Sequence, residues 1–323
     1  MKVLILGGGG FIGSFLCEKL FERNYKIKVI LRYTSSGNIG NLIFLDKKIL
    51  KEIEIIFGDL QDFRVIYEGL KDADYVINLA SLISIPYSFV FPKSVVINNV
   101  EIILNLAEGL REFKIPIIHI STSEVYGKIN YLPIDENHPK SAKSPYAASK
   151  IFMDEFLKSF CEYYKIPFKI IRPFNTFGPR QSQRALIPSI ILQILKNKEV
   201  KIGNLYPKRD FTYVLDIVDG IIKVFESDKG FFEEVILCSG KSYSVMEVIE
   251  KIKEVSKVDF KIVKDEKRER PKEVEIDELL GTYEKAKKIF NFSPKISFEE
   301  GLKITWEWFK ENREKYMEEI FFE

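Results

Sequence analysis

The sequence predicts an α/β protein in which helices cover both faces of a parallel β-sheet. Short, wholly apolar segments recur through residues 2–171, helical segments separate most of them, and four glycines follow the first apolar segment directly. A strand buried on both faces is a continuous apolar run, and strands that alternate with helices imply parallel crossover connections. We therefore predict a Rossmann-like, doubly wound sheet with a smaller C-terminal α/β lobe.

The individual elements follow from this alternation. Strands of the large sheet are expected at 2–6, 27–31, 53–57, 75–79, 115–120 and 168–171, with helices from residue 11 and over 62–70, 95–112 and 145–165. After Pro173, short strands are expected near 200–203, 210–212 and 234–238, and helices near 185–197, 214–226, 244–256, 282–290 and 298–311. The densely charged stretch 264–275 is expected to be a surface loop. This change of pattern predicts two domains, 1–173 and 174–323; no linker marks the boundary, so the chain is free to cross back.

Composition excludes several classes of protein. The 46% hydrophobic and 30% charged residues rule out a disordered chain. A net charge of +2, from 49 basic and 47 acidic residues, argues against nucleic-acid binding through a broad basic face. No apolar segment reaches the roughly 18 residues of a membrane helix, and 3 Cys and 2 His form neither a disulfide framework nor a His-rich metal site. We expect a cytoplasmic protein with no metal, nucleic-acid or membrane partner.

The glycine-rich segment is typical of a dinucleotide site. Gly7, Gly10 and Gly13 lie between the first strand and the first helix. Such a turn lets the backbone approach a pyrophosphate, and the N–H groups at the helix start, near Phe11 and Ile12, favour an anion. This context favours a cofactor site in residues 1–173 over an ordinary flexible turn.

The end of the second strand bears on cofactor choice. An acid usually binds the ribose 2′-hydroxyl there, but this chain has Arg32, followed by Ser35 and Ser36. These groups suit a 2′-phosphate, so NADP is favoured over NAD, unless Arg32 only stacks on the adenine. Asp59, after the third strand, is expected to bind the adenine amine or, alternatively, to cap the helix over 62–70.

Two segments supply candidate catalytic groups. Tyr146 and Lys150 share one face of a predicted helix, where the ammonium favours the phenolate of a phenol with an ordinary pKa near 10. Lys150 can also hold the nicotinamide ribose. Thr122, Ser123 and Glu124 follow the fifth strand, and the carboxyl ends of the strands form the site in such sheets. The alternatives are a Ser/Thr-rich turn and a surface glutamate. His119, which lies within the strand, is expected to be a packed residue.

Together these motifs resemble the extended short-chain dehydrogenases/reductases, the family of nucleotide-sugar epimerases and dehydratases. Further matching segments are Gly58-Asp59, Asn78 to Ser81, Asn99-Val100, Arg172 to Arg180, Arg209 to Val214 and Arg270-Pro271. The resemblance implies cofactor contacts from Leu60, Leu79, Ala80, Ser81 and Asn99, and diphosphate contacts from Arg209 and Arg270. It implies that Asn175 contacts the sugar or the diphosphate. It also implies a homodimer through helices 95–112 and 145–165, where Ile102, Leu106, Phe152 and Phe156 could equally pack inside the subunit.

Within the family, Thr-x-Glu before Val-Tyr-Gly is similar to the 4,6-dehydratases, whereas simple 4-epimerases usually carry a small residue at the position of Glu124. Many dTDP-glucose dehydratases have Asp in place of Ser123, and Thr-Ser-Glu resembles GDP-mannose 4,6-dehydratases instead. Segments 83–88, 182–185, 203–207 and 270–275 resemble the configuration-retaining N-acetylglucosamine 4,6-dehydratases of legionaminic-type pathways, which use GDP- or UDP-linked sugar. This implies substrate contacts from Ser84, Pro86, Tyr87 and Arg184.

The resemblance implies an internal redox reaction. Tyr146 and Thr122 take the 4-hydroxyl proton while C4 hydride passes to the nicotinamide, Glu124 removes the C5 proton as water leaves C6, and the hydride returns to C6. Ser123 is too weak an acid to protonate the leaving hydroxyl alone, so it relays a proton or Glu124 serves as both base and acid. Two alternatives stay open: a UDP-hexose 4-epimerase that does not use Glu124, and a cofactor-binding regulator without catalysis.

Overall fold

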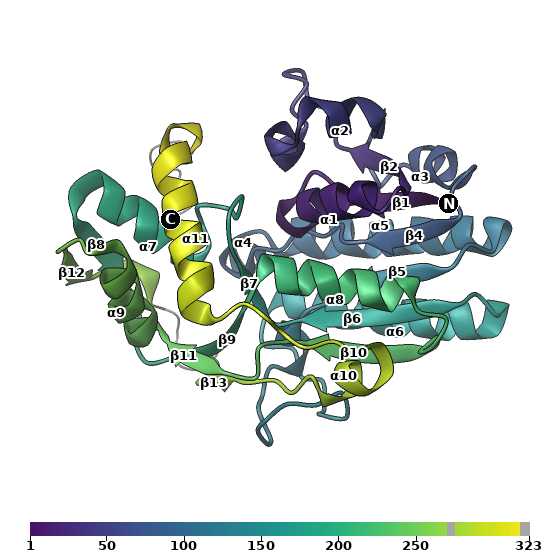
Figure 1. The fold of residues 1–323 in the computed structure, drawn as a ribbon. Coiled ribbons are helices and arrows are strands. Elements are labelled where there is room, and N and C mark those ends of the chain that lie inside the picture. The colour runs from purple at the N-terminus through teal and green to yellow at the C-terminus, as the bar shows by residue number, and fades with distance from the viewer. Residues whose placement is uncertain (270–274, 317–323) are drawn as a thin grey trace.

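The computed structural model describes residues 1–269 and 275–316. Its main feature is a seven-stranded sheet in the order β10-β6-β5-β4-β1-β2-β3, with every neighbouring pair parallel (Figure 1). The strands are β1 (Lys2–Leu6), β2 (Lys26–Leu31), β3 (Glu54–Phe57), β4 (Tyr75–Asn78), β5 (Ile117–Ile120), β6 (Phe168–Pro173) and β10 (Glu233–Leu237). The order reverses between β1 and β4, where ligands bind in sheets of this kind. The predicted fold class is confirmed.

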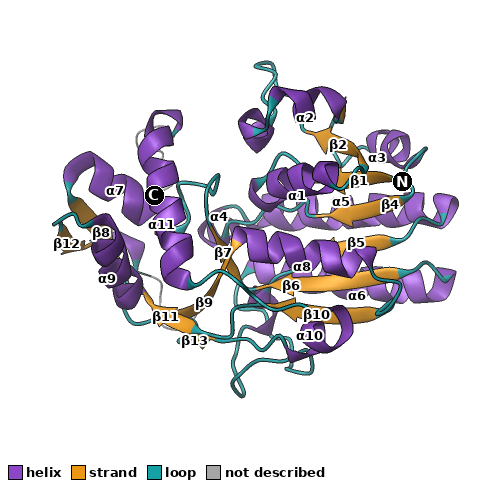
Figure 2. Cartoon of the chain, viewed as in Figure 1, coloured by secondary structure: helices purple, strands orange, loops and turns teal. Residues whose placement is uncertain are grey.

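Helices cover both faces of this sheet, as Figure 2 shows. Helices α1 (Phe11–Glu22) and α8 (Val214–Glu226) pack on one face, and α3 (Phe63–Leu70), α5 (Pro92–Phe113) and α6 (Pro145–Tyr164) on the other. The register of β1 explains its continuous apolar sequence. Val3 and Ile5 enter one core while Leu4 and Leu6 enter the other, because successive side chains of a strand point to opposite faces.

A second lobe, to the left in Figure 1, is built mostly from residues after β6. One sheet contains β7 (Asn175–Phe177), β9 (Lys208–Tyr213), β11 (Ser242–Ser244) and β13 (Glu278–Leu279), and a two-stranded sheet pairs β8 (Glu199–Ile202) with β12 (Lys261–Lys264). The lobe's helices are α7 (Leu186–Asn197), α9 (Val245–Ser256) and α11 (Phe298–Asn312), and α10 (Glu284–Phe290) lies beside β10. The stretch expected to be a loop over 264–275 instead begins with the end of β12 and the short 3₁₀ turn η3 (Glu266–Arg268).

The chain leaves the large sheet after β6, near the expected domain boundary, but then returns to it. Helix α8 covers one face, and β10 adds a seventh strand beside β6, with Val235 paired to Ile171. Val235, Ile236 and Leu237 are almost completely buried, so this apolar run needs the interior of the large sheet. Residues 214–237 therefore belong to the first unit in space although they follow the boundary in sequence.

Several short elements were not predicted, and some of them shape the site. They include the 3₁₀ turns η1 (Gly40–Phe44), η2 (Ser123–Tyr126) and η4 (Arg313–Lys315), and the helices α2 (Lys47–Glu52) and α4 (Ile85–Val90). Pro92 begins α5 directly after α4 ends, so the chain turns there between two helices. Within residues 1–269 and 275–316, no helix is long and apolar enough to cross a membrane.

Candidate active site

The glycine loop forms a tight cradle at the start of α1. Gly7 has a φ of +82°, and its carbonyl accepts a hydrogen bond of 2.9 Å from the N–H of Gly10. A Cβ at Gly13 would lie 2.2 Å from the Gly7 oxygen, so this position excludes any side chain. No side chain caps α1, whose first residues are Phe11 and Ile12. The helix therefore presents its first N–H groups to an anion such as a pyrophosphate.

The loop after β4 closes the other side of this cradle. A Cβ at Gly7 would lie 3.0 Å from the backbone of Leu79 and Ala80, so the two loops meet at the point where the strand order reverses. The hydroxyl of Ser81 is buried and has no hydrogen-bond partner among the described residues. A bare cradle and an unpartnered hydroxyl beside it fit a bound dinucleotide.

Asn99 supports this loop through its side-chain amide. Its Oδ1 accepts from the N–H of Leu82 at 2.8 Å, and its Nδ2 donates to the Leu82 carbonyl at 3.3 Å and to Ser149 Oγ at 2.9 Å. Both amide hydrogens are thus used within the protein, and the expected cofactor contact of Asn99 stays a prediction. Asn99 ties the end of the β4 loop to α6, and so positions it.

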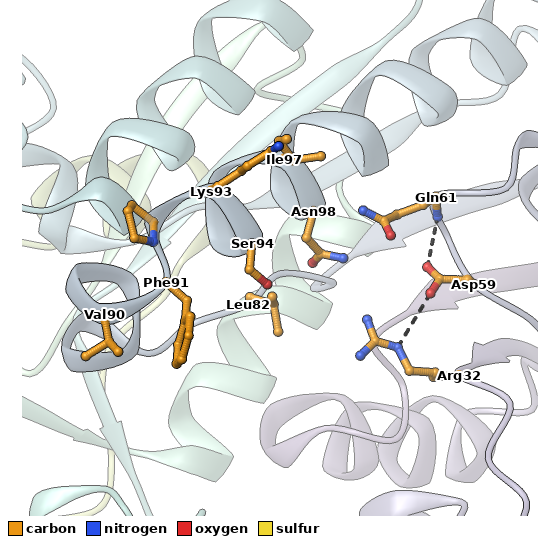
Figure 3. A pocket seen from close by; sticks show the side chains of 11 residues that line it. Arg32, Asp59, Gln61, Leu82, Val90, Phe91, Lys93, Ser94, Ile97 and Asn98 are labelled. Carbon is orange, nitrogen blue, oxygen red and sulfur yellow. Dashed lines mark hydrogen bonds and ion pairs between the residues drawn. The ribbon is translucent and has the colours of Figure 1, made fainter. Parts of the chain in front are cut away.

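Arg32 and Asp59 lie together at one end of a surface hollow of about 780 Å³ (Figure 3). Arg32 Nε is 3.8 Å from Asp59 Oδ2, and Asp59 Oδ1 accepts from the N–H of Gln61 at 3.0 Å. The alternative role of Asp59 as a helix cap is wrong, because Asp62 caps α3. Ser35 and Ser36 are exposed and are not among the lining residues, so the structure does not bring them to Arg32's hollow. Leu60 is half-buried against the core under α3 and α5.

Tyr146 and Thr122 meet where β5 ends and α6 begins. Ser144 caps α6 by accepting from the N–H of Ala147, and Pro145 occupies the first turn, so the helix starts immediately before Tyr146. Tyr146 is only 6% exposed, and this burial raises the pKa of its phenol, an effect that a hydrogen bond with the Thr122 hydroxyl opposes. The fold therefore brings two of the predicted catalytic groups into contact.

Glu124 lies beside this pair, in the 3₁₀ turn that follows β5. Its N–H donates to Thr122 Oγ1 at 3.2 Å, and the charge of its carboxylate contributes to the raised pKa of Tyr146. Thr122 and Glu124 are both half-buried, whereas Ser123 between them is 3% exposed. An extended backbone at Thr122 leads into the turn, so alternate side chains point in different directions. Thr122 and Glu124 are thus more accessible to a ligand than Ser123.

Lys150 lies one helical turn beyond Tyr146 and is almost completely buried. Its Nζ donates to the Ile120 carbonyl at 2.8 Å and lies 3.5 Å from His119 Nε2. Burial lowers the pKa of Lys150 to about 8, because a charged ammonium loses its hydration. Burial and the Lys150 charge lower the pKa of His119 to about 4, so His119 is neutral at physiological pH. His119 is a fully buried residue of β5.

The residues expected to contact the substrate lie in different settings. Ser84 caps α4, accepting from the N–H of Tyr87 at 3.3 Å, while Pro86 is exposed in the first turn. The Tyr87 ring packs against Phe91, with 5.1 Å between ring centroids. Ser84 therefore has a structural role in starting α4, the helix that adjoins the hollow in Figure 3.

The expected diphosphate ligands also differ from one another. Arg209 is 8% exposed and donates to the Ile276 carbonyl at 2.7 Å and to Glu275 Oε1 at 3.0 Å. Asn175 Oδ1 is buried and has no hydrogen-bond partner in the described part of the chain, which suits a ligand contact. Arg184 is exposed just before α7. Arg270 lies outside the described residues.

Sequence reasoning missed the charged groups behind Lys150. Asp154 and Arg172 are completely buried and form an ion pair of 3.0 Å between Oδ2 and Nη2. A signal was available, because Tyr146, Lys150 and Asp154 are spaced by four residues and so share one helix face. Arg172 carried no such signal, since its partner lies on another element.

Known proteins resemble this chain over most of its length. The model of the family described as GDP-mannose 4,6 dehydratase matches residues 4–305. A human dTDP-D-glucose 4,6-dehydratase is 29% identical, covering 96% of this chain and 90% of its own. The structure of a UDP-N-acetylglucosamine 4-epimerase from Methanobrevibacter ruminantium M1, in complex with UDP-N-acetylmuramic acid, is 33% identical with a TM-score of 0.87, covering 96% of this chain and 98% of that one. A UDP-glucuronic acid 4-epimerase from Bacillus cereus, in complex with UDP-glucuronic acid and NAD, is 26% identical with a TM-score of 0.87, covering 96% and 99%.

Proposed function

This chain belongs to the GDP-mannose 4,6-dehydratase family, within the extended short-chain dehydrogenases/reductases that act on nucleotide sugars, and from that premise we propose that it is a nucleotide-sugar 4,6-dehydratase. The proposed substrate is a nucleoside-diphosphate hexose, with GDP- or UDP-linked N-acetylglucosamine as the first candidates. The observation that carries the proposal is the position of Glu124. A carboxylate stands beside the Thr122–Tyr146 pair, where a second proton-transfer group is needed for dehydration.

The first proton transfer is assigned to Tyr146. A bound NAD(P) supplies the redox chemistry that the side chains lack, by accepting a hydride from the sugar and returning it within one turnover. Tyr146, hydrogen-bonded to Thr122, takes the proton of the 4-hydroxyl as C4 is oxidised. Burial raises the pKa of the phenol and so disfavours the phenolate. We assign the Lys150 ammonium, one turn further along α6, to favour it.

The second proton transfer is assigned to Glu124. A ketone at C4 makes the C5 proton acidic, and Glu124 removes it as the C6 oxygen leaves as water. Because Ser123 is buried and a weak acid, Glu124 is the better candidate to protonate that leaving oxygen as well. A solvent-derived proton, delivered by Glu124, then returns to C5 as C6 receives the hydride. One water is lost overall, and the product is a 4-keto-6-deoxy sugar.

A 4-epimerase is the second candidate, favoured by the two epimerase structures that the chain resembles. It would use Tyr146 and Thr122 for the same proton but would leave Glu124 without a role. A third candidate, a non-catalytic dinucleotide-binding regulator, would leave Thr122, Tyr146 and Lys150 without one. Dehydration gives a role to Thr122, Glu124, Tyr146 and Lys150 together, which is why we prefer it.

Mass spectrometry after incubation with candidate nucleotide sugars tests the proposal. GDP- and UDP-N-acetylglucosamine, GDP-mannose and dTDP-glucose should be compared, each with NAD and with NADP. At least one should lose the mass of one water. Conversion of a substrate to an isomer of equal mass would support the epimerase instead, and cofactor binding without turnover of any sugar would support the regulator.

We also propose NADP as the preferred cofactor, a homodimeric state and a cytoplasmic location. The exposed Arg32 guanidinium supports NADP, while the Asp59 carboxylate 3.8 Å from it opposes a second anion. Ile102 and Leu106 pack inside the subunit, the alternative that the sequence left open for them. Phe152 is 40% exposed and stacks on Phe156 at 5.6 Å between centroids, so the outer side of α6 remains the candidate contact. Sedimentation equilibrium of wild type and Phe152→Glu tests it, with a weakened dimer expected.

A further inference from the structure

A network of buried charges lies directly behind the catalytic lysine. Asp154 follows Lys150 by one turn of α6 and is completely buried. Its Oδ2 accepts from Ser121 Oγ at 2.7 Å and from Arg172 Nη2 at 3.0 Å. Arg172 Nη1 in turn donates to Glu234 Oε2 at 2.6 Å, so the network joins α6 to β5, β6 and β10.

The second oxygen of Asp154 faces the lysine side of the network. Asp154 Oδ1 has no hydrogen bond among the residues that the structure describes, and it lies 3.4 Å from His119 Nε2. That same nitrogen is 3.5 Å from Lys150 Nζ. His119 thus stands between the carboxylate and the ammonium.

The tautomer of His119 is fixed from its other side. Asn78 Oδ1 accepts from the N–H of Ala80 at 3.0 Å, which leaves its Nδ2 to donate to His119 Nδ1 at 3.1 Å. A neutral ring therefore carries its proton on Nε2, the nitrogen near both Asp154 and Lys150. A charged lysine has no lone pair with which to accept a hydrogen bond from this N–H. Of these two neighbours, only Asp154 can accept it while Lys150 is charged.

We propose that Asp154 is a positioning residue of the reaction, which keeps Lys150 charged so that this ammonium can favour the phenolate of Tyr146. The charge of Asp154 by itself raises the pKa of Tyr146, so the favourable effect has to pass through Lys150. The role given to Tyr146 in this inference rests on the proposed function. The effect of Asp154 on the charge of Lys150 does not depend on that function. A carboxylate in a water-poor interior stabilises a nearby ammonium far more than a surface carboxylate does. Asp154 acts through Lys150 and touches neither substrate nor cofactor.

The charges around Lys150 shift its pKa in opposite directions, so the loss of one of them should change its protonation. Asp154 on α6 raises the Lys150 pKa, whereas burial and the positive charge of Arg172 on β6 lower it. Among the described residues, His119 on β5 and Tyr146, one turn earlier on α6, are further titratable neighbours. Glu234 on β10 acts one step further away, by pairing with Arg172. Because the Lys150 pKa is about 8, losing the carboxylate should neutralise the lysine near physiological pH.

The test is a direct titration of Lys150 by NMR in full-length protein labelled with ¹³C at lysine Cε. Lys150→Met identifies the resonance by its absence. Asp154→Asn, which keeps the shape of the side chain, should lower the Lys150 pKa by about one pH unit or more, the usual effect of an opposite charge nearby. Arg172→Gln should raise it, because that variant removes the opposing cation. Glu234→Gln is the matched control and should change it far less than Asp154→Asn does.

Activity gives the second readout. The alkaline limb of the kcat/KM profile should move to lower pH in Asp154→Asn, because Lys150 loses its charge at lower pH. If Asp154→Asn does not fold, Arg172→Gln and the double variant, in which the two effects cancel, still decide the matter. A Lys150 titration that is the same in all folded variants overturns the proposal. Shifted titrations without any sugar turnover would support it while refuting the proposed function.

Discussion

Arg32 and Lys150 were both expected to bind the cofactor, but their surroundings differ. The Arg32 side chain is 61% exposed, and its acidic neighbour Asp59 is 3.8 Å away. Lys150 is 2% exposed, with the Ile120 carbonyl 2.8 Å from its Nζ. Salt and water screen the first cation, which is free to reorient toward a phosphate. Fixed protein groups set the protonation state of Lys150. An exposed cation such as Arg32 is therefore expected to contribute binding affinity, whereas a buried one such as Lys150 can control proton transfer.

We expect the largest effects on activity from substitutions of Thr122, Glu124 and Tyr146, which the protein partly encloses. Glu124→Gln should reduce formation of the dehydrated product by about 10²–10⁴-fold, the usual loss when a general base is removed. Cofactor affinity should stay within about twofold, because Glu124 lies outside the glycine cradle. Product assays and cofactor titration check both statements. Glu101→Gln, an exposed substitution on α5, is the control. Wild-type turnover in Glu124→Gln would remove Glu124 from the mechanism.

A second prediction concerns the cost of burying His119. The unfolded chain binds a proton with a pKa near 6.5, but folded His119 has a pKa of about 4. The unfolded state therefore binds more protons between these values, and His119 makes folding less favourable as pH falls through this window. Between pH 7 and pH 5, wild type should lose about 1–2 kcal/mol of unfolding free energy more than His119→Gln does.

Urea unfolding of the two proteins at both pH values measures this difference. Buried carboxylates such as Asp210 and Glu136 titrate in both proteins, so their contributions cancel in the comparison. An equal pH dependence in the two proteins would show that His119 takes up its proton as readily when folded as when unfolded.

Arg209 tests whether the distinction between exposed and buried cations holds throughout the molecule. It was expected to hold the diphosphate, yet it is buried and bonded to Glu275 and the Ile276 carbonyl. If it still reaches the substrate, Arg209→Gln should raise the KM for the nucleotide sugar about tenfold and change kcat little. Lys208→Gln, at the exposed neighbouring position, is the control, and thermal melting monitors folding. A KM unchanged by a folded Arg209→Gln protein would assign Arg209 a purely structural role.

The smallest effect is expected at Arg32. Arg32→Ala should weaken NADP binding about three- to fivefold at low salt and leave NAD binding within about twofold, since an exposed ion pair contributes little. The difference should shrink as salt is raised. Calorimetric titration of both cofactors provides the values. NAD binding equal to or tighter than NADP binding in wild type would sink the proposed preference.

Most of the large sheet could be predicted from sequence, because buried parallel strands and amphipathic helices leave periodic patterns. The shortest elements could not. Strand β13 has only two residues and exists because Leu279 pairs with Arg209, far away in sequence. The return of β10 to the large sheet likewise depends on pairing with β6.

The candidate site was predicted to a similar extent. Spacing alone placed Tyr146 and Lys150 on one helix face, and strand order brought Thr122 and Glu124 to them. Sequence could place a cation but not its partner, because Arg172 is joined to Asp154 only by tertiary packing. The degree of burial, and with it the pKa of a group, arises at this level.

The central claim, that a proton is removed from C5 during loss of water, has a direct measurement. Wild-type enzyme should be incubated in D₂O with GDP- or UDP-N-acetylglucosamine and cofactor, and the product analysed by NMR and mass spectrometry after exchangeable deuterons are replaced. The account predicts a product that has lost one water and carries one deuterium at C5. An isomer of the substrate with no water lost and no deuterium at C5 would contradict it.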